Sequence, residues 1–149
     1  LPDDQIEALS KTKAANSGVL YKRQLVFGMT DMLLHTDPEA CKDTAKTFYD
    51  MQFKVTGIRA PDTTNFVSTF GHLAGGYAAS YFGYAWADVF AQDLVATFKE
   101  QGSMLDPVVG ARYRKEIIGP GATRDFIVGL RNFLGREPNN QAFLKSLGL

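Results

Sequence analysis

Residues 77–101 read YAASYFGYAWADVFAQDLVATFKEQ, and the spacing of their apolar side chains predicts one long helix that ends at Gly102. On a helical wheel, phenols and one carboxylate share a face within an arc of about 60°: Tyr77, Tyr81, Tyr84 and Asp88. The opposite face is apolar and is expected to be buried in a core: Phe82, Trp86, Val89 and Phe90. A neutral phenol can donate a hydrogen bond to a carbonyl or to a developing oxyanion. The alternative is structural, because tyrosine rings also cover the edges of cores.

Apolar residues recur at three- and four-residue steps along most of the chain. The expected helices cover 3–35 with a break near Gly18, 38–55, 77–101, 107–118, 124–134 and 139–147. Asp37 and Asp106 each precede a proline, and each is expected to cap the helix that follows. Since no segment alternates with period two, the sequence predicts an all-α fold of about six helices in a single unit, 1–149.

The longest irregular segment is expected over residues 57–76, which are rich in Gly, Pro, Asn, Thr and Ser. A loop of this length in a compact domain is usually functional or disordered. It contains His72 and the pair Gly75-Gly76, and adjacent glycines let the backbone hinge or approach a ligand closely. A lone histidine is more often a surface or core residue, but here it precedes the tyrosines. We therefore expect a candidate site where this loop meets them.

Composition excludes several classes of function. The 16 Lys and Arg residues balance the 16 Asp and Glu residues, so nothing favours binding to nucleic acid or to an acidic membrane. The opening LPDDQIEAL does not resemble a signal peptide, and polar residues interrupt the most apolar window, so no membrane span is expected. The single Cys41 cannot form an internal disulfide. We expect it to be a buried thiol. The expected location of the protein is intracellular, in the cytoplasm first and in the mitochondrion as the alternative.

Motifs for metal binding and for nucleophilic catalysis are missing from the sequence. The two histidines are His35 and His72, without a His-Glu-x-x-His motif or a cysteine pair, so no catalytic zinc site is expected. There is also no G-x-S-x-G motif for a serine nucleophile. No motif in the sequence therefore identifies a catalytic nucleophile or a metal that could activate a water molecule.

Several motifs resemble the C-terminal end of one family of zinc metallopeptidases. They are FGHLAGGYAASYFGYAWADVF (70–90), GARYRKEIIGPG (110–121) and FLGREP (133–138), followed by a terminal GL. Their order is similar to that in the thimet oligopeptidase, neurolysin and dipeptidyl carboxypeptidase family, over about residues 13–149. The resemblance implies a helical fold and the hydrolysis of short peptides. It also implies a zinc ion held by a His-Glu-x-x-His helix and a later glutamate, all upstream of this chain.

The resemblance implies roles for individual residues as well. Tyr84 and His72 would stabilise the transition state at the carbonyl oxygen of the substrate. Tyr77 and Tyr81 would bind and orient the peptide. Because the zinc ligands and the general base would lie elsewhere, the isolated chain is expected to be inactive.

By the same resemblance, Gly75 and Gly76 are the hinge glycines of a flexible substrate-binding loop. Phe82 stands where many members of the family carry another tyrosine. The implied partners are short peptide substrates and the zinc-bearing N-terminal part of the same enzyme. Apolar surface left exposed would also allow a homodimer.

Other interpretations of the sequence remain open. The chain starts at Leu1 without a methionine and directly in helical sequence, which suggests a cut piece or a processed product. It could instead be a non-catalytic peptide-binding or adaptor module, a purely structural helical domain, or one half of a two-chain peptidase. Whether the enzyme would be an endopeptidase or a dipeptidyl carboxypeptidase is open as well.

Overall fold

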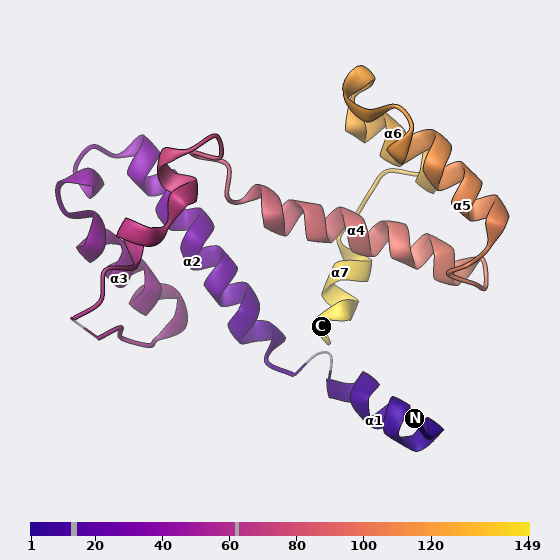
Figure 1. Ribbon diagram of the computed structural model, residues 1–149, viewed down its shortest axis with the longest axis horizontal. Coiled ribbons are helices and arrows are strands. Elements are labelled where there is room, and N and C mark those ends of the chain that lie inside the picture. The colour runs from indigo at the N-terminus through magenta and orange to yellow at the C-terminus, as the bar shows by residue number, and fades with distance from the viewer. Residues whose placement is uncertain (13–14, 62) are drawn as a thin grey trace. The chain divides into compact units, whose positions relative to one another are not determined.

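The computed structural model describes residues 1–12, 15–61 and 63–149. Within these residues the structure contains seven α-helices, several 3₁₀ turns, one π-helical turn and no strand (Figure 1). The prediction of an all-α fold is confirmed. The chain divides into two compact units, Leu1–Trp86 and Ala87–Leu149. Among the described helices, none combines the length and the apolar character needed to cross a bilayer.

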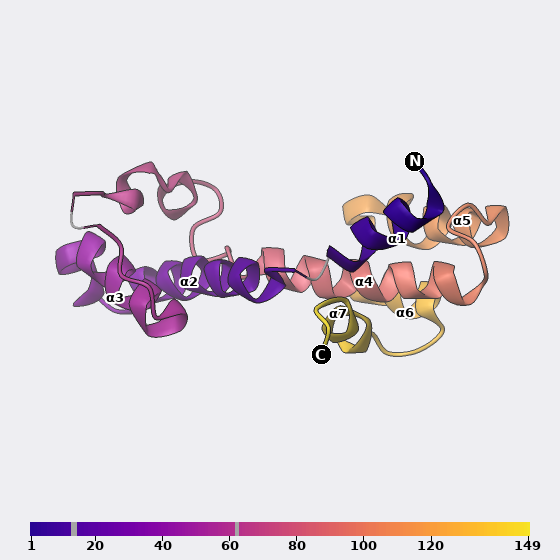
Figure 2. The same cartoon turned by 90° about the horizontal axis from the view of Figure 1, so that it is seen from below.

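The first unit is built around two helices. The expected helix over 3–35 is divided into α1 (Asp3–Lys11) and α2 (Ser17–Thr36), so a break exists as predicted, but it lies before Ser17 and Gly18 falls inside α2. Helix α2 lies beside α3 (Thr44–Thr56), as both ribbon views show (Figures 1 and 2). This pair supports the segment that follows α3.

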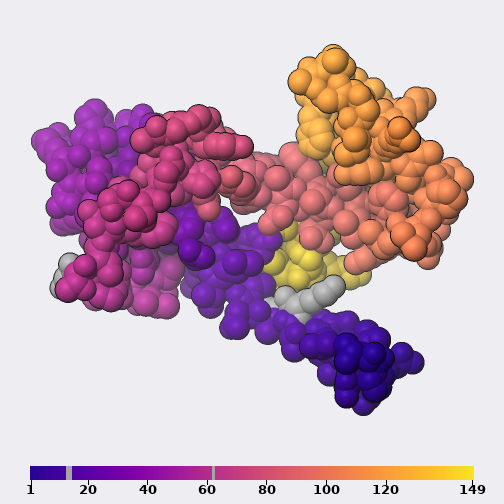
Figure 3. Space-filling model, viewed as in Figure 1, coloured from indigo at the N-terminus to yellow at the C-terminus, as the bar shows by residue number. Residues whose placement is uncertain are grey.

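Aromatic rings form most of the core of the first unit. Its buried members are Val26, Phe27, Phe48, Met51 and Phe70. The Phe27 ring stacks on that of Phe66, with the centroids 5.1 Å apart. Burying one such side chain contributes about 1.5–3 kcal/mol. Helix α3 also contacts the 3₁₀ turn Phe66–Thr69, and the two lie in the same part of the space-filling view (Figure 3).

The helix expected over 38–55 begins later than predicted. A 3₁₀ turn, Ala40–Asp43, follows Asp37, and α3 starts only at Thr44. The Asp43 side chain accepts the N–H of Lys46 at 2.9 Å and is therefore the cap of α3. The capping role expected for Asp37 is thus limited to the turn.

Cys41 lies in this 3₁₀ turn and is exposed, so the prediction of a buried thiol was wrong. Its thiol donates to the backbone oxygen of Leu34 at 3.0 Å. The statistical preference of cysteine for cores does not hold here because the residue lies on a surface turn between two helices.

Helix α4 (Gly83–Glu100) starts at Gly83 and not at Tyr77 as predicted. The preceding residues form a turn in which Ala79 has a φ of +56°, outside the helical region. A helical wheel therefore does not apply to residues 77–82. The predicted burial of Phe82 and Trp86 was also wrong, since these side chains are 48% and 56% exposed.

The second unit contains the remainder of α4 and three short helices, α5 (Pro107–Tyr113), α6 (Phe126–Leu134) and α7 (Gln141–Ser146). Its buried core consists of Leu94, Val109, Leu130 and Phe133. As predicted, the Asp106 side chain caps α5 by accepting two backbone N–H groups. A π-helical turn, Arg114–Ile118, extends α5.

Candidate functional site

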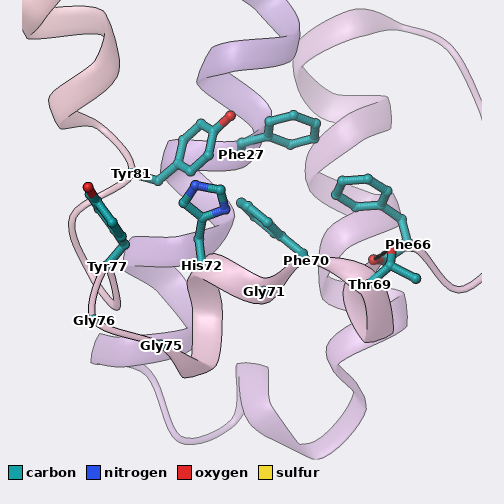
Figure 4. A pocket seen from close by; sticks show the side chains of 10 residues that line it. All are labelled: Phe27, Phe66, Thr69, Phe70, Gly71, His72, Gly75, Gly76, Tyr77 and Tyr81. Carbon is teal, nitrogen blue, oxygen red and sulfur yellow. Dashed lines mark hydrogen bonds between the residues drawn. The ribbon is translucent and has the colours of Figure 1, made fainter.

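The candidate site lies in the first unit and is formed by residues 72–84. The 3₁₀ turn Gly71–Ala74 carries His72, and the following turn carries Tyr77. Tyr81 comes just before α4, and Tyr84 lies in its first turn. The chain reverses direction between the turns, so His72, Tyr77 and Tyr81 come together (Figure 4). Tyr84 joins them, with its ring centroid 5.0 Å from that of Tyr81.

His72 is the centre of this cluster. Its Nε2 atom shares a hydrogen bond of 3.2 Å with the hydroxyl of Tyr84. Its ring centroid lies 5.0 Å from that of Tyr81 and 5.7 Å from that of Tyr77, both edge-on. Tyr77 and Tyr84 stack with their planes 20° apart. The structure thus brings together the four side chains that the sequence analysis selected, although not by the predicted helical face.

A cavity of about 540 Å³ adjoins the cluster. Phe27 and Phe70 contribute its apolar wall, and His72, Tyr77 and Tyr81 project into the same space (Figure 4). Tyr77, one of its lining residues, is 58% exposed, so the cavity reaches the surface. Its size and its few polar groups on an aromatic wall are typical of small-ligand sites.

Tyr81 is held in its neutral form. Burial raises the pKa of its phenol, the neighbouring Tyr84 raises it further, and the guanidinium of Arg23 partly opposes both effects. A phenol with a raised pKa keeps its proton at neutral pH and can donate a hydrogen bond. Its ring meets that of Phe27 edge-on at 5.4 Å, so the core fixes its orientation.

The two candidate hinge glycines differ in their surroundings. A Cβ atom at Gly75 would lie 3.1 Å from the backbone oxygen of Gly71. A Cβ atom at Gly76 would meet no atom of the described residues within 4 Å. Close backbone approach thus favours glycine at Gly75, whereas only flexibility would favour it at Gly76.

The described residues do not form a metal site. In residues 1–12, 15–61 and 63–149, no three His, Cys, Asp or Glu side chains are grouped so that they could hold an ion. His35 belongs to α2, where its Nδ1 atom donates to the backbone oxygen of Asp31 at 2.7 Å. These residues do not fit a zinc ion.

One residue beside the site was missed in the sequence analysis. Asp31 on α2 is fully buried, and its carboxylate accepts the backbone N–H groups of Ala79 and Tyr81. The signal that could have indicated it is an acidic residue four positions after Phe27, on the buried face of an amphipathic helix. The backbone N–H groups that it binds lie 48 and 50 residues later in the chain, so no local sequence pattern could identify them.

Comparison with known proteins gives a consistent result. The model of a family described as Peptidase family M3 matches residues 1–149. Saccharolysin of Saccharomyces cerevisiae is 37% identical over 156 residues, which cover all of this chain and 21% of that protein. Thimet-like oligopeptidase of Dictyostelium discoideum and oligopeptidase A of Haemophilus influenzae are each 32% identical, over all of this chain and 22% of each relative.

The chain thus spans about a fifth of the length of the curated relatives that it matches. Over that span, the family match covers the three motifs on which the resemblance was based and the residues of the His72 cluster. The resemblance to the thimet oligopeptidase family is confirmed by these matches, and the chain belongs to peptidase family M3.

Proposed function

We propose that this chain is the C-terminal, substrate-binding part of the catalytic domain of a zinc-dependent oligopeptidase that hydrolyses short peptides. The observation that carries the proposal is the hydrogen bond between His72 and Tyr84, 3.2 Å long, at a tyrosine-lined cavity. Membership of family M3 supports the class of reaction, and two of the three relatives compared above are named as oligopeptidases.

The geometry supports an arrangement in which His72 donates a hydrogen bond to Tyr84 and Tyr84 donates one to the substrate. If the Nε2–H of His72 donates to the phenolic oxygen, the hydroxyl proton of Tyr84 is free to donate to the carbonyl oxygen of a peptide. A donor that is already in place when charge develops on that oxygen lowers the barrier. In this arrangement Tyr84 is the oxyanion donor, and His72 orients and polarises it.

The neighbouring residues would bind and orient the substrate. Tyr77 is exposed and stacks on Tyr84, so its ring can contact a bound peptide. The neutral phenol of Tyr81 can hydrogen-bond the peptide backbone. The loop at Gly75 and Gly76 would close over the bound peptide, since glycines allow such a segment to move.

Zinc would supply an activated water as the nucleophile when it is bound. Its ligands and the general base would belong to the zinc-bearing N-terminal part of the same enzyme. The isolated chain should then bind peptides weakly and cleave none. We also propose an intracellular location, because one relative is named as cytosolic and another as chloroplastic/mitochondrial.

The test is Tyr84→Phe in the full-length polypeptide that contains this chain. Loss of one oxyanion donor should lower kcat by about 10²- to 10³-fold. KM should change much less, because the phenyl ring and its stacking remain. The matched control is Tyr113→Phe, since the ring of Tyr113 packs against Phe133 in the core of the second unit. An unchanged kcat for Tyr84→Phe, or an equal loss in the control, would refute the role.

A further inference from the structure

Asp31 is a buried carboxylate that the reaction described above does not use. Its side chain is fully buried on α2. Among the described residues, the one basic group within ion-pair distance is His35, whose Nδ1 atom lies 3.2 Å from Asp31 Oδ1. Burying a carboxylate is unfavourable unless hydrogen bonds compensate for the lost water. Its hydrogen bonds therefore indicate what it does.

Both oxygens of this carboxylate bind one short stretch of backbone. Oδ1 accepts the N–H of Ala79 at 3.0 Å, and Oδ2 accepts the N–H of Tyr81 at 2.9 Å. Hydrogen bonds to an ionised carboxylate are about twice as strong as those between neutral groups. Two of them from one rigid side chain fix both the position and the direction of the turn.

The turn that Asp31 binds is strained. Ala79 has a φ of +56°, which residues other than glycine adopt at a cost. A second contact supports the same region, because a Cβ atom at Gly28 of α2 would lie 3.4 Å from the Cα atom of Phe82. Helix α2 thus contacts residues 79–82 through two hydrogen bonds and close packing, and one of these residues has an unfavourable φ.

The held segment is the one that carries the tyrosines. Asp31 binds the backbone of Tyr81, whose ring lies 5.0 Å from those of His72 and Tyr84. Releasing this backbone would let the chain between Gly76 and α4 relax. The hydrogen bond between His72 and Tyr84 depends on this segment, because the segment lies between the two residues in the sequence.

We propose that Asp31 is a positioning residue for the peptide site, whose carboxylate holds the strained turn 79–81 and thereby keeps Tyr81 and Tyr84 against His72. This inference rests on the proposed function for its effect on catalysis. The clamp itself rests on the two hydrogen bonds and on the conformation of Ala79.

The experiment uses Asp31→Asn in the full-length polypeptide. Asparagine has the same shape but only one accepting oxygen, so one of the two N–H groups would face a donor. Hydrogen exchange of the amides of Ala79 and Tyr81, followed by mass spectrometry, should become about 10- to 100-fold faster. The kcat for a short quenched-fluorescence peptide should fall about tenfold or more, with a smaller change in KM.

The matched control is Asp93→Asn in the second unit. Asp93 is also buried, and it also accepts a backbone N–H, that of Asn139 at 2.9 Å. Its replacement should destabilise the second unit but leave both the exchange at residues 79–81 and the kcat of the folded protein at the wild-type values. A general loss of stability would therefore be separated from loss of the clamp.

A second variant tests the strain directly. Ala79→Gly removes the cost of the positive φ, so in the Asp31→Asn background it should recover part of the lost kcat. Exchange at residues 79–81 equal to the wild type in Asp31→Asn would overturn the clamp. Faster exchange with an unchanged kcat would overturn the positioning role. Failure of the proposed function would be seen instead in the wild-type protein, as absence of peptide cleavage.

Discussion

The two glycines of the loop provide a direct test of what the loop does, because the structure treats them differently. Gly75→Ala would place a Cβ atom 3.1 Å from the backbone oxygen of Gly71. Gly76→Ala would place one where no atom of the described residues lies within 4 Å. The same chemical change at adjacent positions therefore tests close packing at one and flexibility at the other.

The size of the effect follows from the contact. Carbon and oxygen normally approach to about 3.4 Å, so the backbone around Gly71 must move by a few tenths of an ångström, at a cost of about 1 kcal/mol. That backbone belongs to the turn Gly71–Ala74, which carries His72. A displacement of about 1 Å costs about 10²-fold in rate, so this smaller shift should lower kcat by about 3- to 10-fold.

The assay is steady-state cleavage of a quenched-fluorescence peptide by the full-length polypeptide. Gly75→Ala should lower kcat as estimated. Gly76→Ala adds no steric contact and leaves Gly75 as a hinge for loop closure, so it should stay within about twofold of the wild type. Unaltered circular dichroism spectra would show that both variants fold. Equal losses at the two positions would mean that flexibility and not packing is required, and an unaffected Gly75→Ala would refute the steric reasoning.

Two further predictions concern the second unit. Burial alone would raise the pKa of Asp93, but hydrogen bonds from Arg136 and from the N–H of Asn139 hold it below its ordinary value of 3.8. A carboxyl group with a lowered folded pKa stabilises the fold above its unfolded pKa and loses this contribution as the pH falls through the folded value. The destabilisation caused by Asp93→Asn in urea unfolding should therefore be full near pH 6 and shrink below about pH 3.8, and a pH-independent difference would contradict it. At Gly129 a Cβ atom would lie 2.5 Å from the backbone oxygen of Glu116, so Gly129→Ala should lower the free energy of unfolding by about 2–3 kcal/mol, and wild-type stability would contradict this.

Features of the fold that depend on neighbouring residues were predictable from the sequence. Gly57 and Gly135 end α3 and α6 with φ values of +75° and +70°, and a glycine directly after an apolar helical run is a local signal for such an end. Asp106 caps α5 because its side chain reaches only two and three residues ahead. The helical spacing of apolar residues was likewise enough to predict the all-α fold class, because telling a helix from a strand needs only the local pattern.

The start of α4 was not predictable from local sequence, because two amides just before it bind a residue that is distant in the chain. The amides of Ala79 and Tyr81 would have entered the first turns of the predicted helix, but they bind Asp31 instead, 48 and 50 residues earlier in the chain. The apolar periodicity of residues 77–82 was therefore a misleading guide to their backbone. At these residues, tertiary hydrogen bonds outweigh the local preference for a helix.

The tyrosine cluster was selected by an argument whose geometry was wrong at two of its three phenols. Tyr84 lies on a helix, whereas Tyr77 and Tyr81 lie before it. They nevertheless meet because the chain folds back at the glycines and brings His72 between them, 5.7 Å from one ring and 5.0 Å from the other. The chemistry of the residue types was enough to identify the members of the cluster. The turn that brings them together is bound by Asp31 on α2, far away in the sequence.

The candidate site is stiff because it is continuous with the core of the first unit. The ring of Phe27, only 7% exposed, meets Tyr81 edge-on, and Phe70 also contacts both Tyr81 and His72. Phe27 and Asp31 lie four residues apart on α2, so this one helix holds the ring of Tyr81 through the first and its backbone through the second. An oxyanion donor is effective only if it needs no rearrangement when charge appears. In the proposed site, Tyr81 packs on buried rings and its backbone N–H binds a buried carboxylate, and the ring of Tyr84 lies 5.0 Å from that of Tyr81, so these contacts would limit such rearrangement.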